Sequence, residues 1–412
     1  MSHVYLSSRV FPLLILGFAS GLPLALTSGT LQAWATVANA PLTQIGFLTL
    51  VGSAYTLKFL WAPLIDRYAV PLLGRRRGWI ALSQLVLAAS IFLMGLFNPS
   101  EQLGWIALVA VFVAFMSATQ DIAFDAYSTD VLRNNERAAG AAVKVLGYRL
   151  AMIFSSGLAL VIADQWLGWN GMYMMMGGVM AVCVFATLLA PEPEVTVAPP
   201  RTLRLAVIEP LVEFFKRPEA LSILVLIVLY KLGDAFAGAL STTFLIRGAG
   251  FSVSEVGTIN KIFGLAATII GALIGGALMD RLGLFRSLML FGLLQAVSNL
   301  GYWYLAISDQ SLFWMGAVVA LENLCGGMGT AAFVALLMAL CNQQFSATQF
   351  ALLSALSAVG RTYLAGPLTP PLVESLGWPV FFLVTVVLAL PGLWLLWSKR
   401  AAIISMDKHE TL

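Results

Sequence analysis

Ten charged side chains fall inside stretches of this sequence that are otherwise apolar. The cations are Lys58, Lys144, Arg149, Lys231, Lys261 and Arg361, and the anions are Asp121, Asp125, Asp234 and Glu322. A charge at the centre of a bilayer costs about 2.5–3.5 kcal/mol on insertion scales, so such side chains face protein or water. The pattern therefore predicts a hydrated, charged cavity that is enclosed by membrane helices.

The four carboxylates are candidates for proton binding. Asp121 and Asp125 are spaced i, i+4, so they share one face of a helix. Poor solvation and mutual repulsion both favour protonation of one member of such a pair. We expect Asp121, Asp125, Asp234 and Glu322 to include the proton-coupling groups. The alternative is permanent ion pairing, either with Lys58 or Lys144 or, for Asp234, with Lys231 three residues earlier.

Arg149 and Arg361 are the strongest candidates for substrate recognition. A guanidinium group can bind a carboxylate or phosphate through two parallel hydrogen bonds. Six cations and four anions give the predicted cavity a net charge of +2, which favours an anionic solute. Structural pairing with Glu322 or Asp121 is the competing interpretation. Further predicted contacts are Lys58, Lys144, Lys231, Lys261, Gln120, Tyr55, Tyr148 and Asn323. For Gln120, Tyr55 and Tyr148 the alternative is ordinary helix packing.

Composition places these residues in a polytopic, all-α membrane protein. The 412 residues are 60% hydrophobic and only 10% charged, whereas soluble domains are about 25% charged. Apolar windows of about twenty residues predict transmembrane helices. We predict twelve, over residues 11–37, 44–66, 78–97, 103–131, 137–163, 170–190, 219–246, 253–280, 286–306, 312–341, 347–374 and 378–398.

The long polar gap in the middle of the chain divides it into two halves. We predict an N-terminal six-helix bundle over 1–190, a linker with an amphipathic helix over 191–218, a C-terminal bundle over 219–400 and a tail over 401–412. Sixteen of the 23 Lys and Arg residues fall in loops on one side. The positive-inside rule then places both termini and the linker in the cytoplasm.

The two halves repeat one another. Asp66-Arg67 corresponds to Asp280-Arg281, Arg149 corresponds to Arg361, and Leu-Gly-Trp occurs at both 167–169 and 376–378. Two six-helix halves related by an axis along the membrane normal form the major facilitator fold of two pseudo-symmetric bundles. Gly-Ala-Leu-Met-Asp-Arg-Leu-Gly at 276–283 resembles the loop signature of that superfamily. We therefore predict gating loops at Asp66, Arg67, Arg75, Asp280 and Arg281, with simple positive-inside anchoring as the alternative.

Enzymatic motifs are lacking in the sequence. There is no Walker loop, no Gly-x-Ser-x-Gly and no metal-ligand cluster; the two histidines are terminal, and the three cysteines lie in apolar spans. We expect a secondary transporter without a catalytic or metal site, without a cofactor and without a nucleic-acid partner, driven by a proton gradient.

Long segments resemble one family, the AmpG-type muropeptide permeases. They include residues 17–34, 120–132, 229–236, 322–329 and 345–361. The resemblance implies proton-driven import across the bacterial inner membrane. Its implied cargo is N-acetylglucosaminyl-anhydro-N-acetylmuramic acid, an anionic glycopeptide when the stem peptide is attached. It also implies a role in cell-wall recycling and β-lactam resistance. Some relatives carry two further helices, and we expect a monomeric twelve-helix core to suffice for transport.

Two other functions fit the residues alone. The chain could transport another organic anion, or it could be a receptor or scaffold whose cavity binds a solute without moving it. Charged groups in both halves favour transport, because alternating access uses both halves.

Overall fold

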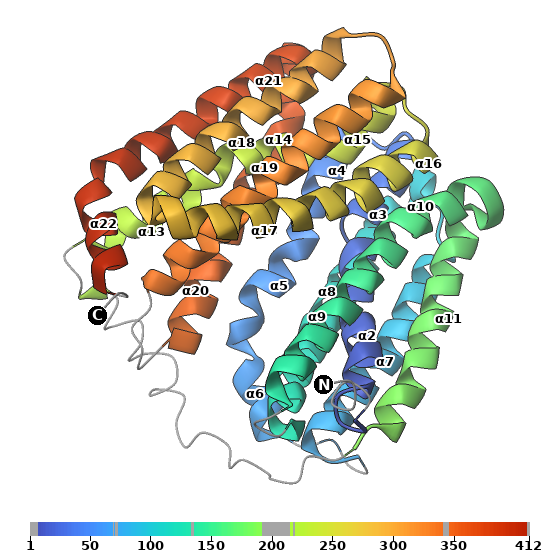
Figure 1. Ribbon diagram of the computed structural model, residues 1–412. Coiled ribbons are helices and arrows are strands. Elements are labelled where there is room, and N and C mark those ends of the chain that lie inside the picture. Colours follow the sequence, from blue (N-terminus) through green and yellow to red (C-terminus); the bar gives the residue numbers. More distant parts are fainter. Residues whose placement is uncertain are drawn as a thin grey trace. The chain divides into compact units, whose positions relative to one another are not determined.

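The computed structural model describes residues 7–68, 70, 73–132, 136–191, 215–216, 219–340 and 346–409 (Figure 1). Within these ranges every regular element is a helix and no strand occurs. The chain divides into two compact units. Unit 1 comprises Met1–Ala40 and Val51–Arg201, and unit 2 comprises Pro41–Leu50 and Thr202–Leu412. The predicted all-α class is confirmed.

Unit 1 is built from helices that are mostly long and apolar. Its α-helices are α2 (Pro12–Leu26), α3 (Gly29–Val37), α5 (Ser53–Leu57), α6 (Ala62–Arg67), α7 (Arg75–Met94), α8 (Pro99–Val131), α9 (Arg137–Met152), α10 (Ala159–Ile162) and α11 (Gly168–Leu189). Asn98 caps α8 by accepting a hydrogen bond from the backbone N–H of Ser100, and Pro99 occupies the first turn, where its missing N–H is not needed.

Unit 2 repeats this pattern and begins with α4 (Leu42–Phe47). Its other α-helices are α13 (Ala220–Tyr230), α14 (Leu232–Ala239), α15 (Ser241–Thr243), α16 (Val253–Glu255), α17 (Gly264–Leu282), α18 (Leu284–Ile307), α19 (Leu312–Ala339), α20 (Ser346–Val359), α21 (Gly366–Ser398) and α22 (Arg400–His409). Helix α18 packs against both α19 and α21 (Figure 1).

Nine stretches of the described chain are long and apolar enough to cross a membrane. Two of them, Val143–Leu189 and Leu352–Ser398, each contain 47 residues. At 1.5 Å per residue such a stretch spans about 70 Å, more than twice the hydrocarbon core of about 30 Å. Each is interrupted by a glycine with positive φ, Gly168 or Gly377, so each has the length for two crossings. The count of twelve remains a prediction.

The internal repeat is visible in the backbone. Six of the described residues have positive φ, and they form three pairs: Asn39 with Gly250, Gly74 with Gly283, and Gly168 with Gly377. The members of a pair are 211, 209 and 209 residues apart in the sequence. A positive φ costs little for glycine and is tolerated by asparagine. Both halves therefore use the same left-handed turns at equivalent helix starts.

Several predicted helices are broken rather than continuous. The predicted span 11–37 divides at Thr27 and Ser28, and the span 219–246 divides at Lys231 and again at Leu240. The span 44–66 is a series of short α and 3₁₀ pieces. Hydropathy windows could not find these breaks, because a broken helix is as apolar as a straight one. The predicted linker, residues 191–218, lies almost entirely outside the described residues, so its amphipathic helix stays a prediction.

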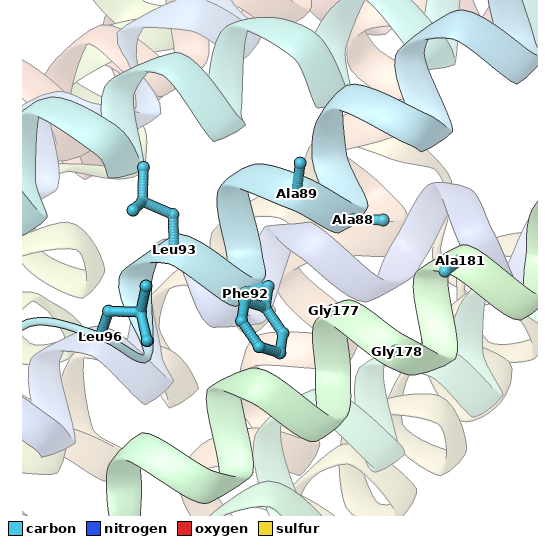
Figure 2. A pocket seen from close by; sticks show the side chains of 8 residues that line it. All are labelled: Ala88, Ala89, Phe92, Leu93, Leu96, Gly177, Gly178 and Ala181. Carbon is cyan, nitrogen blue, oxygen red and sulfur yellow. The ribbon is translucent and has the colours of Figure 1, made fainter.

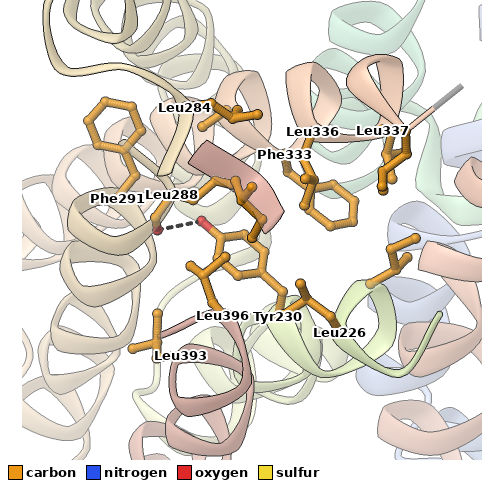
Figure 3. Close-up of a cluster of buried hydrophobic side chains, with 14 of the residues drawn as sticks. Leu226, Tyr230, Leu284, Leu288, Phe291, Phe333, Leu336, Leu337, Leu393 and Leu396 are labelled. Carbon is orange, nitrogen blue, oxygen red and sulfur yellow. Dashed lines mark hydrogen bonds between the residues drawn. The ribbon is translucent and has the colours of Figure 1, made fainter. Parts of the chain in front are cut away.

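Each unit has its own apolar core. In unit 1, Leu13, Leu16, Ile80, Phe124 and Tyr127 pack together at the ends of α2, α7 and α8. In unit 2 the core joins α13, α18, α19 and α21 (Figure 3). There the hydroxyl of Tyr230 donates a 2.9 Å hydrogen bond to the carbonyl of Leu288, which satisfies the polar end of a buried aromatic ring.

Candidate functional site

The ten charged residues are shared equally between the units. Unit 1 holds Lys58, Lys144, Arg149, Asp121 and Asp125, and unit 2 holds Lys231, Lys261, Arg361, Asp234 and Glu322. Each unit therefore carries three cations and two anions.

The two aspartates of α8 have different partners although they share a helix face. Asp125 accepts a 2.5 Å hydrogen bond from the Nζ of Lys144, which also donates to Ser128 at 3.1 Å and lies 4.8 Å from the centre of the Phe124 ring. Asp121 instead accepts a 2.5 Å hydrogen bond from the Oγ of Ser20 on α2. Asp125 is thus ion-paired, whereas Asp121 is held by a neutral donor.

Other predicted residues of unit 1 surround Asp121. The negative charge of Asp121 interacts electrostatically with Lys58 and Lys144. It also interacts with the hydroxyl groups of Tyr55 and Tyr148. Gln120 is fully buried, and neither polar atom of its side chain has a hydrogen-bond partner among the described residues. Arg149 is exposed on α9 and makes no ion pair within 4.0 Å in the described part of the chain.

In unit 2, Lys231 and Asp234 lie where α13 ends and α14 begins. Their side chains are 4.0 Å apart, and the Nζ of Lys231 also donates to Thr330 at 3.2 Å. The ring of Phe333 lies 5.8 Å from the same nitrogen. This arrangement supports the self-neutralising interpretation of the pair.

Among the described residues, the groups that bind Glu322 of α19 are neutral. Its Oε2 accepts hydrogen bonds from the amide of Asn323 at 2.9 Å and from the hydroxyl of Tyr302 at 3.4 Å. Asn323 is held in turn by the hydroxyl of Thr268, which donates to its Oδ1 at 3.0 Å. In the described part of unit 2 no cation lies within 4.0 Å of Glu322. A carboxyl group with neutral partners can gain or lose a proton without breaking an ion pair.

Lys261 and Arg361 both lie in π-helical segments, Val256–Phe263 and Gly360–Ala365. Lys261 donates a 2.7 Å hydrogen bond to Thr242, beside the break at Leu240, and Arg361 is exposed. A third π-helical segment, Ile153–Leu158, follows Arg149. π-Helical turns are frequent at functional sites. The hydrophobic periodicity did not reveal them, because a π turn adds one residue without changing composition.

The predicted gating residues are only partly visible. The side chains of Asp66, Arg67, Arg75 and Asp280 lie outside what the structure describes, and Arg281 is exposed. The neighbouring basic residues are engaged: Arg76 forms a 3.0 Å ion pair with Asp130, and Arg77 donates to the last carbonyls of α11, at 3.2 Å to Thr187 and 2.6 Å to Leu188.

A groove of about 500 Å³ lies between α7 and α11 of unit 1 (Figure 2). It is lined by small and apolar residues: Ala88, Ala89, Phe92, Leu93, Leu96, Gly177, Gly178 and Ala181. None of these is charged or was predicted as a site residue, so this groove offers nothing to orient a polar solute.

Comparison with known proteins gives consistent results. The family model of the Major Facilitator Superfamily matches residues 13–363 and 234–404. The anhydromuropeptide permease of Escherichia coli (strain K12) is 62% identical over 394 residues, which cover 96% of this chain and 80% of the relative. Putative transporter AmpG 4 of Rickettsia conorii is 31% identical over 96% of this chain and 97% of its own length.

Solved structures show the same fold. A bacterial homologue of the human lysosomal transporter Spinster, in an inward-facing conformation, has a TM-score of 0.70 at 15% identity over 98% of both chains. A D-xylose–proton symporter has a TM-score of 0.69 at 13% identity, covering 95% of this chain and 97% of its own. At these identities the likeness concerns the fold alone.

Proposed function

Because this chain belongs to the Major Facilitator Superfamily and, within it, to the anhydromuropeptide permeases, we propose that it imports anhydro-muropeptides by proton symport. The chain is a transporter rather than an enzyme. Proton coupling, the side of the membrane on which the termini lie, and the monomeric state belong to the proposal. Both termini and the linker lie in the cytoplasm of a bacterial inner-membrane protein, as the basic loops favour.

The bonding of Glu322 supports proton coupling. Two neutral donors, Tyr302 and Asn323, hold its carboxyl group. Asp125 and Asp234 have lysines within 4.0 Å instead, so protonating them means separating an ion pair. Asp121, which Ser20 holds, is the second candidate. Symport requires a group that binds a proton in one state and releases it in another, and Glu322 meets that need without the loss of an ion pair.

Arg149 and Arg361 are proposed to bind the carboxylates of the cargo. Both side chains are exposed, and neither makes an ion pair within 4.0 Å among the described residues. A planar guanidinium group binds a carboxylate in a bidentate manner, which a lysine cannot do. Lys58, Lys144, Lys231 and Lys261 then supply the surrounding positive potential.

The decisive experiment compares two assays on purified protein in liposomes. Glu322→Gln keeps the size of the side chain and fixes it in a neutral form. We expect this variant to lose accumulation of radiolabelled anhydro-disaccharide under an inward proton gradient, but to keep counterflow exchange without a gradient. Asp309→Asn, in the loop between α18 and α19, is the matched control and should behave as wild type.

Other outcomes would replace the proposal. Gradient-dependent uptake of a different anion would change the cargo, and saturable binding without flux would indicate a receptor. Full accumulation by Glu322→Gln would remove Glu322 from the coupling step and direct attention to Asp121.

A further inference from the structure

Helix α18 carries a buried polar stripe that its composition did not suggest. Gln295, Ser298, Asn299 and Tyr302 are exposed by 5%, 2%, 1% and 2%. At 100° per residue these four positions fall within an arc of about 100°. The opposite side of the helix presents Leu290, Leu293, Leu294, Val297 and Leu300 outward. The helix is therefore apolar where it meets lipid and polar where it meets its neighbours.

Two amides in this stripe lack hydrogen-bond partners. Both side-chain atoms of Asn299, and the Nε2 of Gln295, have none among the residues that the structure describes. A buried amide without a partner is costly, and native proteins satisfy such groups with internal water when protein atoms do not. The two amides are therefore the positions at which we expect bound water.

The facing helix carries small residues where Gln295 packs against it. Glu322, Gly326 and Gly329 follow the spacing i, i+4, i+7 on α19, so they share one face. A Cβ at Gly326 would lie 3.5 Å from the Nε2 of Gln295, and a Cβ at Gly329 would lie 2.7 Å from its Oε1. The glycines therefore admit the amide of Gln295 against the backbone of α19.

The two helices are in register along this interface. Tyr302 contacts Glu322 at 3.4 Å. Gln295 lies seven residues before Tyr302, and Gly329 lies seven residues after Glu322, as two antiparallel helices require. Asn299 falls between these contacts, at the level of Gly326. Seven residues correspond to about 10 Å of helix, a third of the hydrocarbon thickness.

We propose that the α18–α19 interface, defined by Tyr302, Asn299 and Gln295 opposite Glu322, Gly326 and Gly329, holds a file of water molecules that conducts protons to and from Glu322. This inference rests on the proposed symport. Asn299 and Gln295 are positioning residues, since they orient water and do not themselves exchange the proton. When the carboxyl group of Glu322 ionises, its proton passes to the adjacent water. An equivalent proton leaves the far end of the file, and the carboxylate keeps the hydrogen bonds from Tyr302 and Asn323.

The far end of the file is closed by apolar side chains. Leu288 and Phe291 of α18 meet Phe333 and Leu336 of α19 in the core cluster of unit 2 (Figure 3). These side chains continue the same interface beyond Gln295, toward the end that the basic loops make cytoplasmic. A dry segment prevents protons from crossing without cargo, so the file ends at a barrier that must open once in each transport cycle.

The charges around Glu322 are held on other elements. Lys231 and Asp234, at the α13–α14 break, interact electrostatically with Glu322. Lys261, in the π-helical segment before α17, does so as well. Arg361 acts on Lys261 from its own π-helical segment. Variants of Asn299 and Gln295 leave all of these groups in place, so a change in pH dependence can be assigned to the water file.

The test uses Asn299→Leu and Gln295→Met, which keep side-chain size and remove the polar atoms. We expect the initial rate of proton-driven uptake to fall at least about tenfold, which corresponds to about 1.4 kcal/mol. Counterflow at equal pH should remain within about twofold of wild type, since it needs no net proton movement. Asn299→Ser, which can still bind water, should restore most of the driven uptake. The pH profile of driven uptake should shift in Asn299→Leu and not in Asn299→Ser.

A matched control lies in unit 1. Gln84 of α7 precedes Gln295 by 211 residues, is fully buried, and also has an Nε2 without a partner in the described chain. Gln84→Met makes the same chemical change at the repeat-related position, and driven uptake should persist. Normal driven uptake by Asn299→Leu and Gln295→Met would overturn the water file. So would equal loss of counterflow and driven uptake without rescue by Asn299→Ser. A wild-type protein that exchanges cargo but never accumulates it would instead overturn the proposed symport.

Discussion

Helix α2 packs closely against α9. Whether a larger residue at Gly21 of α2 lowers the stability of the protein depends on one atom of α9, the carbonyl oxygen of Tyr148. Gly17 and Gly21, spaced i, i+4 on α2, face the backbone of α9. A Cβ at Gly21 would lie 2.7 Å from the carbonyl oxygen of Tyr148 and 3.1 Å from its Cα. Ordinary van der Waals contact begins at 3.4 Å, so Gly21→Ala requires the helices to separate by about 0.7 Å, within the range of backbone shifts caused by overpacking.

The magnitude follows from the nature of the neighbour. A backbone carbonyl in a helix cannot rotate away as a side chain can, so the whole of α9 must move. Overpacking of this kind costs about 1–3 kcal/mol. The displaced segment carries Tyr148 and Arg149, so we expect Gly21→Ala to reduce both thermal stability and uptake.

Gly178→Ala is the matched control, because no atom lies within 4 Å of a Cβ at Gly178 in the middle of α11. Alanine favours a helix over glycine by about 0.5–1 kcal/mol, so this variant should be neutral or slightly more stable. The assay is thermal unfolding of the purified protein in detergent, followed by tryptophan fluorescence. Equal melting temperatures for Gly21→Ala and Gly178→Ala would refute the close packing of α2 on α9.

Two further predictions concern recognition and coupling. Arg149→Lys and Arg361→Lys should each raise the KM for cargo that carries a stem peptide by about tenfold, because the bidentate contact is lost. The KM for the peptide-free disaccharide should rise less. Equal increases for both cargoes would mean that the arginines bind the sugar instead. Phe291→Ala should allow protons to cross without cargo by thinning the apolar barrier between Gln295 and the start of α18. A pH-sensitive dye inside liposomes would report this leak, and wild-type tightness would mean that the barrier lies elsewhere.

Local sequence determined much of the fold. Apolar windows located the long helices to within a few residues: the predicted span 103–131 lies within α8, Pro99–Val131, and the span 286–306 lies within α18, Leu284–Ile307. Hydropathy works here because a backbone in lipid must satisfy its own hydrogen bonds, and a helix does so within one segment. The Leu-Gly-Trp repeat likewise marked the sites where Gly168 and Gly377 adopt positive φ.

The residues of the candidate site could be predicted from the sequence, but the residues with which they pair could not. The intramembrane charges are conspicuous in the sequence because each one is costly in lipid. Which charge pairs with which depends on the rotation of neighbouring helices about their axes, and the sequence of one helix does not contain that information. Asp121 and Asp125 share a face, yet Ser20 binds one and Lys144 binds the other.

The amino-acid sequence by itself determined that this protein is a helical membrane transporter with two related halves and a set of charges within its apolar spans. Tertiary structure alone decided that the helices break at Lys231 and Leu240, that neutral groups hold Glu322, and that Gln295 faces the glycines of α19. The physical reason is that hydropathy is a property of each segment, whereas the environment of a polar group is set by the helices that pack against it.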